Sequence, residues 1–322
     1  MRTDKTRLGR GGRIAIRCAA VGLGLTLDRL VGEPSFGPHP VGVLGSWLAA
    51  AERRWYGDRV ARGAVFAASS TGVAALFGYR ITRIAPLFGL ATLTWLASAG
   101  RMLAEAGNDI GAALAAADLD LARQRLPNLV GRDPAQLNEA EIVRAVVESL
   151  AENTVDAVVA PAFWALLAGG AGVVAHRTVN TLDAMVGHRS LRYERFGKAS
   201  ARLDDVMAWL PARLTALILA ALQPGRAGAV WKSVRTQAPA HPSPNSGVAE
   251  AAAAAVLGVT LGGTNRYGNR VETRPALGSG PAPERGHIAE AVELVGRVER
   301  AVALCCGVAA VLAIVGSRRR QT

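Results

Sequence analysis

Cysteine, aromatic residues and charged residues are all scarce in this sequence. There are 3 cysteines among 322 residues, aromatic residues make up 5% and charged residues 19%, whereas charged residues make up about 25% of an average soluble domain. Cys18, Cys305 and Cys306 lie in apolar stretches, without a CxxC pair or a histidine at ligand spacing. The sequence therefore supports neither a disulfide framework nor a zinc site.

Lysine is almost absent, although the chain is strongly basic. It carries 37 basic and 25 acidic residues, a net charge of +12, and only three of the bases are lysines. No basic patch interleaved with aromatic residues and no zinc-finger spacing accompanies this charge, so a nucleic-acid partner is not expected. Anionic membrane lipid and a phosphorylated substrate explain the positive charge better.

Long unbroken apolar runs of the kind that build a channel or permease are also missing. Residues 64–78 and 84–99 are apolar runs of marginal length, joined by a short turn with Arg80 and Arg83, and they predict a helical hairpin in the membrane. The run 301–316 ends at three arginines, which is typical of a membrane helix with a basic stop. Strand-rich segments and internal repeats are lacking. We predict an all-α fold, a polytopic or partly embedded membrane helical bundle whose Gly/Pro-rich cytoplasmic loops form the site.

Two further segments are predicted to be helical without crossing a membrane. Residues 14–27 are apolar but number only fourteen, fewer than the ~20 that a span needs. Residues 101–128 place Leu and Ala at helical spacing between charges, as in an amphipathic soluble helix that Pro127 closes.

Polar residues of catalytic type concentrate in the segment 131–213. Glu148, Glu152 and Asp156 are spaced i, i+4 and i+8, which places three carboxylates on one helical face. Such a face is either solvated or needs a cation, a basic partner or a shared proton. The next run alternates acids and amides with bases: Asn180, Asp183, Asp204 and Asp205 with Arg177, Arg189, Arg192, Lys198 and Arg202. Acids for a divalent cation beside bases for phosphate oxygens suit a nucleotide site.

Two apolar runs next to these residues are interrupted. Pro161 and the glycines at 169–172 interrupt the run 157–175, which predicts either a broken or re-entrant helix or a clean span. Pro211 and Arg213 lie inside the run 206–222. Because an arginine in the membrane costs several kcal/mol unless it faces a partner or a wet cavity, both helices are predicted to wall a polar site.

Four Gly/Pro-rich segments are predicted to be loops. One contains His39, and HPSPNSG at 241–247 contains a second loop histidine. Residues 261–269 and 274–281 are rich in glycine, so their backbone N–H groups could cradle phosphate. Neither has the Walker pattern or a GxGxxG that follows a strand.

The motifs occur together in one order: DRLVGEP (28–34), HPVGVLG (39–45), GRD (131–133), VESLAENTVDAVVAPAFW (147–164), NTLDAMVGH (180–188), FGKASARLDDV (196–206), PAR (211–213), HPSPNSG (241–247), LGGTNRYG (261–268) and RPALGSG (274–280). In this the chain resembles the adenosylcobinamide-phosphate synthases of cobalamin biosynthesis, the CobD/CbiB family. Five positions depart mildly from the family pattern, and none of them removes an ionisable group from the acidic and basic set: Ala157, Ala162, Ala184, His188 and Ala249.

The resemblance implies a membrane-bound enzyme of late corrinoid assembly that uses ATP and Mg²⁺. Its reaction joins adenosylcobyric acid to (R)-1-amino-2-propanol or its O-phosphate in an amide bond, through an acyl-phosphate. It further implies a location in the cell membrane with the site on the cytoplasmic face, and cobalamin synthase as a partner. The catalytic domain would be 28–290, preceded by a basic N-terminus and short helix (1–27) and followed by a membrane helix and basic tail (291–322).

Three sets of site residues follow as hypotheses. The catalytic candidates are Glu148, Glu152, Asp183, His39 and His241. A subset of Glu148, Glu152, Asp183, Asp204 and Asp205 would hold Mg²⁺. The candidates for binding substrate and phosphate are Arg132, Asn153, Asn180, Arg189, Lys198, Arg202, Arg213, Ser243 and Asn245. Each has a structural alternative, such as a helix cap for Asn180 or a membrane anchor for Arg213.

Two other classes of protein share some of these features. A membrane phosphotransferase of the CDP-alcohol type also uses clustered aspartates, but its DxxDGxxAR pattern is absent. A non-enzymatic sensor or scaffold similar to the AmpE proteins would not need the dense set of acids, bases and asparagines. Alanine at Asp183 or Glu152 would leave such a scaffold working.

Overall fold

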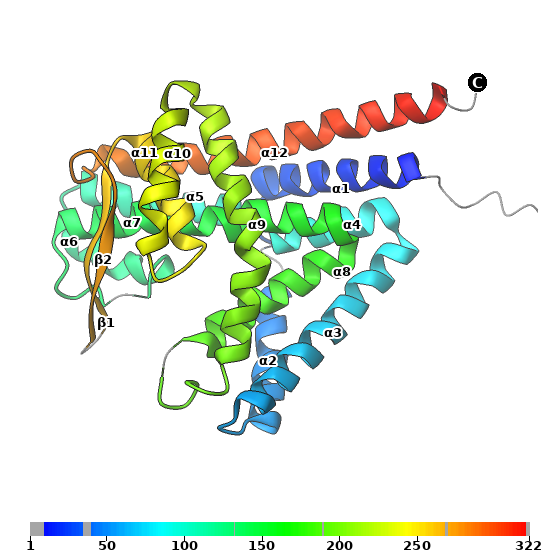
Figure 1. Ribbon diagram of the computed structural model, residues 1–322, viewed down its shortest axis with the longest axis horizontal. Coiled ribbons are helices and arrows are strands. Elements are labelled where there is room, and N and C mark those ends of the chain that lie inside the picture. The colour runs from blue at the N-terminus through cyan, green and yellow to red at the C-terminus, as the bar shows by residue number, and fades with distance from the viewer. Residues whose placement is uncertain (1–9, 35–39, 132, 189, 268–269, 320–322) are drawn as a thin grey trace, which may run out of the picture. The chain divides into compact units, whose positions relative to one another are not determined.

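A computed structural model describes residues 10–34, 40–131, 133–188, 190–267 and 270–319 (Figure 1). The helices are α1 Arg10–Val31, α2 Pro40–Trp55, α3 Val60–Ile84, α4 Pro86–Ala97, α5 Gly100–Ala115, α6 Leu119–Arg125, α7 Glu139–Thr154, α8 Ala160–Leu182, α9 Lys198–Leu222, α10 Ala227–Thr236, α11 Ser246–Leu257 and α12 Gly286–Arg319. In the described chain, five helical stretches are long and apolar enough to cross a membrane: Val60–Ile84, Pro86–Ala115, Glu139–Gly187, Lys198–Leu222 and Gly286–Ser317. The predicted all-α membrane fold is therefore confirmed.

The chain divides into two compact units. Unit 1 comprises Met1–Ser98, Pro161–Asp204 and Arg300–Thr322, and unit 2 comprises Ala99–Ala160 and Asp205–Glu299. One boundary falls between α4 and α5, and the other three fall within α8, α9 and α12. The predicted catalytic domain 28–290 is one continuous stretch of sequence, whereas each unit combines separate stretches. The units therefore do not test that prediction.

The predicted hairpin of unit 1 consists of α3 and α4, which pack against each other, but its turn is shorter than expected. Arg80 and Arg83 lie in the last turns of α3 instead of in a loop, and the chain turns at Ala85. Pro86 follows, lacks an N–H and fits the first position of a helix. It also disfavours the α region for the residue before it, and Ala85 has φ −128° and ψ 82°.

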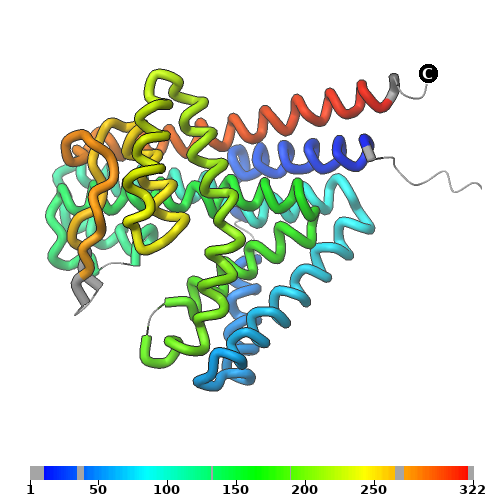
Figure 2. Tube along the Cα trace, viewed as in Figure 1, coloured from blue at the N-terminus to red at the C-terminus, as the bar shows by residue number. Residues whose placement is uncertain are grey.

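Glycines allow close helix packing in unit 1. Helix α1 packs along α4 (Figure 2), with Gly24 against the backbone of Ala91. Gly78 of α3 and Gly170 of α8 approach each other so closely that a Cβ on either would contact the carbonyl oxygen of the other. Helix α8 is broken beside this contact, at Gly169 with φ 65° and ψ −148°. Of the two alternatives left open for the run 157–175, the structure therefore has the broken helix.

We expect Gly78→Ala to destabilise the protein by about 1–3 kcal/mol, because the new methyl group would collide with the Gly170 backbone. Gly72→Ala in the same helix is the matched control. No described atom lies within 4 Å of the position that its Cβ would take, and alanine is a better helix former than glycine by about 1 kcal/mol. Thermal unfolding in detergent compares the two variants, and equal melting temperatures would contradict the packing argument.

Helix α7 forms the centre of unit 2. Asn138 and Glu141 form a capping box at its start, and most of its apolar side chains are buried. It contacts α5, α6 and α11. The predicted helix 101–128 is two helices, α5 and α6, because Ala117 adopts φ 58° and Asp118 then caps α6 by accepting the Leu121 N–H at 2.9 Å. The predicted short helix 14–27 is also wrong in extent, since α1 has 22 residues.

The two glycine-rich segments that we expected to be loops form an antiparallel hairpin, β1 Thr260–Tyr267 and β2 Arg270–Gly278. The prediction of loops was therefore wrong here, although the described chain has no sheet larger than these two strands. The ladder is irregular between Leu261 and Gly263, where Gly262 has φ 92°, so the sequence shows no alternating apolar pattern. Two strands alone are only marginally stable. These strands pack on α7 and α11, and this contact stabilises them.

Candidate functional site

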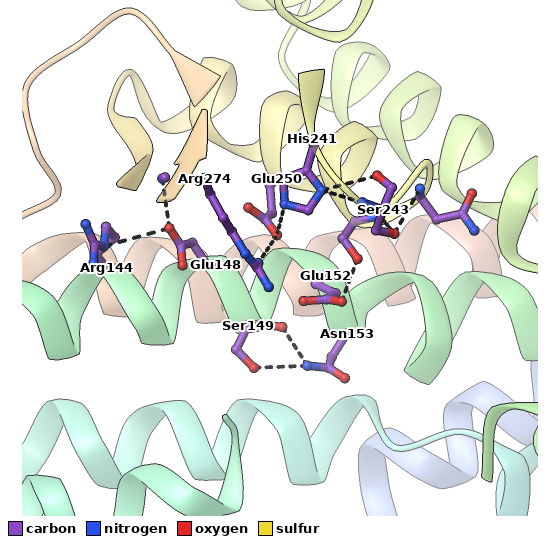
Figure 3. Close-up of polar contacts among 12 residues, drawn as sticks. Arg144, Glu148, Ser149, Glu152, Asn153, His241, Ser243, Glu250 and Arg274 are labelled. Carbon is purple, nitrogen blue, oxygen red and sulfur yellow. Dashed lines mark hydrogen bonds and ion pairs between the residues drawn. The ribbon is translucent and has the colours of Figure 1, made fainter. Parts of the chain in front are cut away.

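A buried carboxylate on α7 connects this helix to the hairpin (Figure 3). The Glu148 side chain is almost fully buried, and one of its oxygens accepts the backbone N–H of Gly262 at 2.8 Å. The same oxygen lies 3.9 Å from Nε of Arg144, one turn earlier on α7. Arg144 also donates to the carbonyl oxygen of Thr264 at 2.8 Å. Glu148 and Arg144 together fix the start of β1 against α7.

The next turn of α7 carries a second polar group. One oxygen of Glu152 accepts the Ser246 hydroxyl at 2.5 Å. The Asn153 amide donates to the carbonyl and hydroxyl oxygens of Ser149 at 2.9 and 3.0 Å. Glu152 and Asn153 are partly exposed, so they are accessible to a substrate. Asp156, the third acid of the predicted face, lies in the π-helical turn Val155–Val159, where the spacing of a regular α-helix no longer applies.

The loop His241–Gly247 lies near Glu152, and its histidine is held by protein groups. The backbone N–H of Ser243 donates to Nδ1 of His241 at 3.1 Å. Nε2 lies 3.7 Å from the carboxylate of Glu250, which also lies 3.6 Å from Nη1 of Arg274. Burial lowers the pKa of His241, and the Arg274 guanidinium acts in the same direction, against the Ser243 carbonyl oxygen, 3.2 Å from Nδ1, and the Glu152 carboxylate. The imidazole is therefore neutral at neutral pH.

Arg213 of α9 reaches the same loop. Its Nη1 donates to Oδ1 of Asn245 at 3.0 Å, and its guanidinium lies 4.3 Å from the Trp209 ring centroid. The Asn245 amide donates to the backbone carbonyl of Asp205 at 2.8 Å. The arginine that interrupts this apolar helix therefore has a polar partner, as predicted for the wall of a polar site.

Seven of the predicted site residues therefore lie in unit 2 on α7, α9 and the His241 loop: Glu148, Glu152, Asn153, Arg213, His241, Ser243 and Asn245. Asp205 is also in unit 2, and the rest of the described set belongs to unit 1: Asn180, Asp183, Lys198, Arg202 and Asp204. His39, Arg132 and Arg189 lie outside the described residues. No group of three or more His, Cys, Asp or Glu side chains that could hold a metal occurs in the described chain. The Mg²⁺ ligand set stays a prediction.

Arg192, one of the bases in the predicted alternation, has a structural role in unit 1. It donates to Glu52 at 2.9 Å and lies 4.0 Å from the ring centroid of Tyr56. The Tyr56 hydroxyl in turn donates to the Arg192 carbonyl at 2.9 Å. The hydrogen bond with Glu52 raises the pKa of Arg192, followed by the one with Tyr193. These contacts occupy the guanidinium.

A cavity of about 460 Å³ adjoins the buried carboxylate of α7. Arg144 and Gly262 line it, together with Asn138 and Glu141 at the start of α7 and the turn around Gly280. Its volume falls within the roughly 300–1,000 Å³ of sites for ligands of drug size. The charged side chains that line this space are those of Arg144 and Glu141. Glu148, Glu152 and His241 belong to the same unit but do not line it.

Four polar residues of this site were missed in the sequence: Arg144, Ser246, Glu250 and Arg274. Arg144 precedes Glu148 by four residues, a spacing that predicts a helical ion pair. Glu250 is the one acid in the alanine-rich stretch 249–255. Both were detectable signals, whereas the approach of Arg274 to Glu250 depends on how the hairpin packs.

The comparisons with known proteins agree with one another. The family model described as CobD/Cbib protein matches residues 21–295. The "Cobalamin biosynthesis protein CobD" of Mycobacterium tuberculosis (strain ATCC 25618 / H37Rv) is 42% identical over 312 residues, 95% of this chain and 97% of that protein. The protein of the same name from Chromobacterium violaceum is 42% identical over 85% of this chain and 91% of that protein. The one from Rhodobacter capsulatus is 39% identical over 85% of this chain and 90% of that protein. No solved structure matches. The resemblance found in the motifs is confirmed, and the chain belongs to the CobD/Cbib protein family of cobalamin biosynthesis.

Proposed function

We propose that this protein is an ATP-dependent acid–amine ligase. It would join the free propionate of adenosylcobyric acid to (R)-1-amino-2-propanol, or to its O-phosphate, and form adenosylcobinamide or its phosphate. The observation that carries the proposal is the polar site of unit 2, in which Arg144 of α7 lines a cavity of about 460 Å³ and the carboxylates of Glu148 and Glu152 follow on the same helix. The family to which the chain belongs supports it.

The chemistry explains why both charges are needed. A carboxylate is a poor acyl donor, because oxide would have to leave. An oxygen of the propionate would attack the γ-phosphorus of ATP and release ADP, and the amine would then attack the acyl carbon and expel phosphate. Arg144, which faces the cavity, would stabilise the charge on the phosphoryl oxygens.

Glu152 is the group we assign to the amine. Its carboxylate is partly exposed and one oxygen is held by Ser246, so it would attract the ammonium group and orient it. The ammonium group would first lose one proton to solvent, which gives its nitrogen the lone pair needed for attack. The nitrogen becomes far more acidic once it bonds to the acyl carbon, and Glu152 can then take the second proton that it loses, leaving the amide N–H. Neutral His241, whose Nδ1 accepts from Ser243, would position the loop rather than act as this base.

Carboxylates of α7 are the donors that we propose for Mg²⁺. It takes one or two carboxylates and otherwise phosphate oxygens and water, and Glu148 and Glu152 lie one turn apart on α7. When bound with ATP, the ion would offset negative charge on the phosphate oxygens.

The experiment that tests the function uses the full chain purified in detergent. Adenosylcobyric acid, ATP and Mg²⁺ are supplied with aminopropanol or with its phosphate, and the corrinoid product and ADP are measured. We expect product with one amine at least, formed together with ADP and only when ATP is present. No product with either amine from folded protein would favour a sensor or scaffold similar to AmpE.

We further propose that the protein lies in the cytoplasmic membrane with this site on the cytoplasmic face, where ATP is found, and that it contacts anionic lipid and cobalamin synthase there. Reporter fusions after Arg59 and Gln124, on either side of the α3–α4 hairpin, are both expected to be cytoplasmic. A periplasmic signal at either position would contradict this topology.

A further inference from the structure

Unit 2 contains a second, smaller pocket, lined by none of the residues to which the proposed ligation assigns a role. It lies between α10 and the turn that follows β2 and has a volume of about 160 Å³; Figure 1 shows α10, α11 and β2 beside one another. Its polar lining consists of Arg226, Lys232, Ser233 and Gln237 with the turn Gly278–Gly280. The volume is well below the roughly 300 Å³ at which sites for drug-sized ligands begin, so the pocket suits a small group.

Two cations face this space without a protein counter-charge. Among the described residues, no acid pairs with the side chain of Arg226 or Lys232 and neither side chain donates a hydrogen bond. The Arg226 guanidinium lies against the backbone at Gly258, 3.1 Å from where a Cβ would stand. Gly258 has φ 76° and ends α11, so a glycine is favoured there for its conformation and also leaves room for the guanidinium.

The turn that closes the pocket is held in place by side chains. Gln237 donates to the carbonyl oxygen of Gly278 at 3.0 Å and accepts the N–H of Gly278 at 2.7 Å. The Ser233 hydroxyl donates to the same Gln237 oxygen at 2.5 Å. The next two backbone N–H groups, those of Ser279 and Gly280, have no acceptor in the described part of the chain. The pocket is thus lined by two exposed cations and by a turn whose N–H groups at Ser279 and Gly280 are open to an acceptor.

This combination matches one kind of ligand. Phosphate oxygens accept hydrogen bonds from backbone N–H groups and from cationic side chains. A phosphate monoester carries about −1.5 to −2 charges at pH 7, which balances Arg226 and Lys232, whereas a carboxylate or a phosphodiester carries only one. We propose that this pocket binds a phosphate monoester group.

The monoester has two possible sources. Helix α10 follows α9, a candidate membrane span, after four residues, and its Trp231 is 62% exposed. Tryptophan is enriched where a protein meets the headgroup region of a bilayer, so the headgroup of phosphatidic acid is one source. A small soluble phosphate ester is the other. Either would be recognised by the same donors, and neither requires that the protein be a ligase.

Hydrogen exchange of the full chain tests the proposal without turnover. The probes are inorganic phosphate and glycerol phosphate in neutral detergent, and bilayer nanodiscs with phosphatidic acid or with phosphatidylcholine alone. We expect one monoester source at least to slow exchange at Ser279 and Gly280, with a concentration dependence that gives a dissociation constant. Arg226→Gln/Lys232→Gln should raise that constant at least tenfold. Arg235→Gln is the matched control, because Arg235 lies on the same helix but does not line the pocket, and it should keep the protection.

Each outcome decides the proposal. Protection by the soluble monoesters in detergent, or by phosphatidic acid alone, supports the site and identifies its source. If no probe slows exchange at Ser279 and Gly280, the proposal is overturned. It is also overturned if a probe protects the double variant and Arg235→Gln equally. The melting temperatures of the variants are compared first. If the double variant is unfolded, Lys232→Gln alone replaces it, and its dissociation constant must still exceed that of Arg235→Gln.

Discussion

Glu152→Gln is expected to lower the rate of corrinoid amide formation by roughly 10²–10³-fold while the protein stays folded. The amide oxygen of glutamine can still accept the Ser246 hydroxyl, so the contact between α7 and α11 persists. What is lost is the negative charge that would orient the ammonium group and take the proton that the nitrogen loses after it bonds to carbon. The rate with saturating ATP and corrinoid substrate measures this effect, and the melting temperature in detergent shows whether the fold is kept.

Glu139→Gln is the matched control for this variant. It removes the same charge from the same helix, but Glu139 lies in the first turn of α7 and pairs with Arg285 at 2.8 Å, and both side chains are more than 40% exposed. Exposed pairs of this kind contribute about 0.2–1 kcal/mol, so both rate and stability should change little. If Glu152→Gln kept at least half of the activity, Glu152 would not act on the amine.

The polar site shows which parts of a structure a sequence can predict. The spacing of Glu148 and Glu152 placed both acids on one face of α7, because helical periodicity is a local property. The HPSPNSG motif likewise identified His241 and Asn245 as loop residues. Their neighbours could not be found this way. Glu250 meets Arg274 only because β2 packs on α11, and a contact between distant segments leaves no periodic signal.

The fold shows the same limit. Apolar runs predicted the helices of the membrane region, since a run of sufficient length has few alternatives in a bilayer. The hairpin was missed because Gly262 and Gly263 adopt positive φ angles that read as turns in a sequence. The break between α5 and α6 depends on Ala117 at φ 58°, a conformation that alanine rarely adopts and that its surroundings must impose.

Glu250→Ala is expected to destabilise the protein by about 3–5 kcal/mol, the usual cost of leaving a buried charge without its partner. Glu250 is 0% exposed, and its carboxylate lies 3.6 Å from Nη1 of Arg274 and 3.7 Å from Nε2 of His241. Without it, the Arg274 guanidinium would remain in a partly buried position with its charge uncompensated. Thermal unfolding in detergent should show a large drop in melting temperature.

A double-mutant cycle separates this electrostatic cost from the cost of an empty cavity. Arg274→Met removes the charge and keeps an apolar side chain of similar length, so Glu250→Ala/Arg274→Met should be more stable than the sum of the single losses implies, with a coupling of about 0.5–3 kcal/mol. Glu250→Gln, which keeps the volume, should fall between wild type and Glu250→Ala. Strictly additive losses would mean that Glu250 stabilises unit 2 by packing alone. A measured coupling would instead make this buried carboxylate the group that holds the hairpin and the His241 loop on α11, and hence in reach of α7.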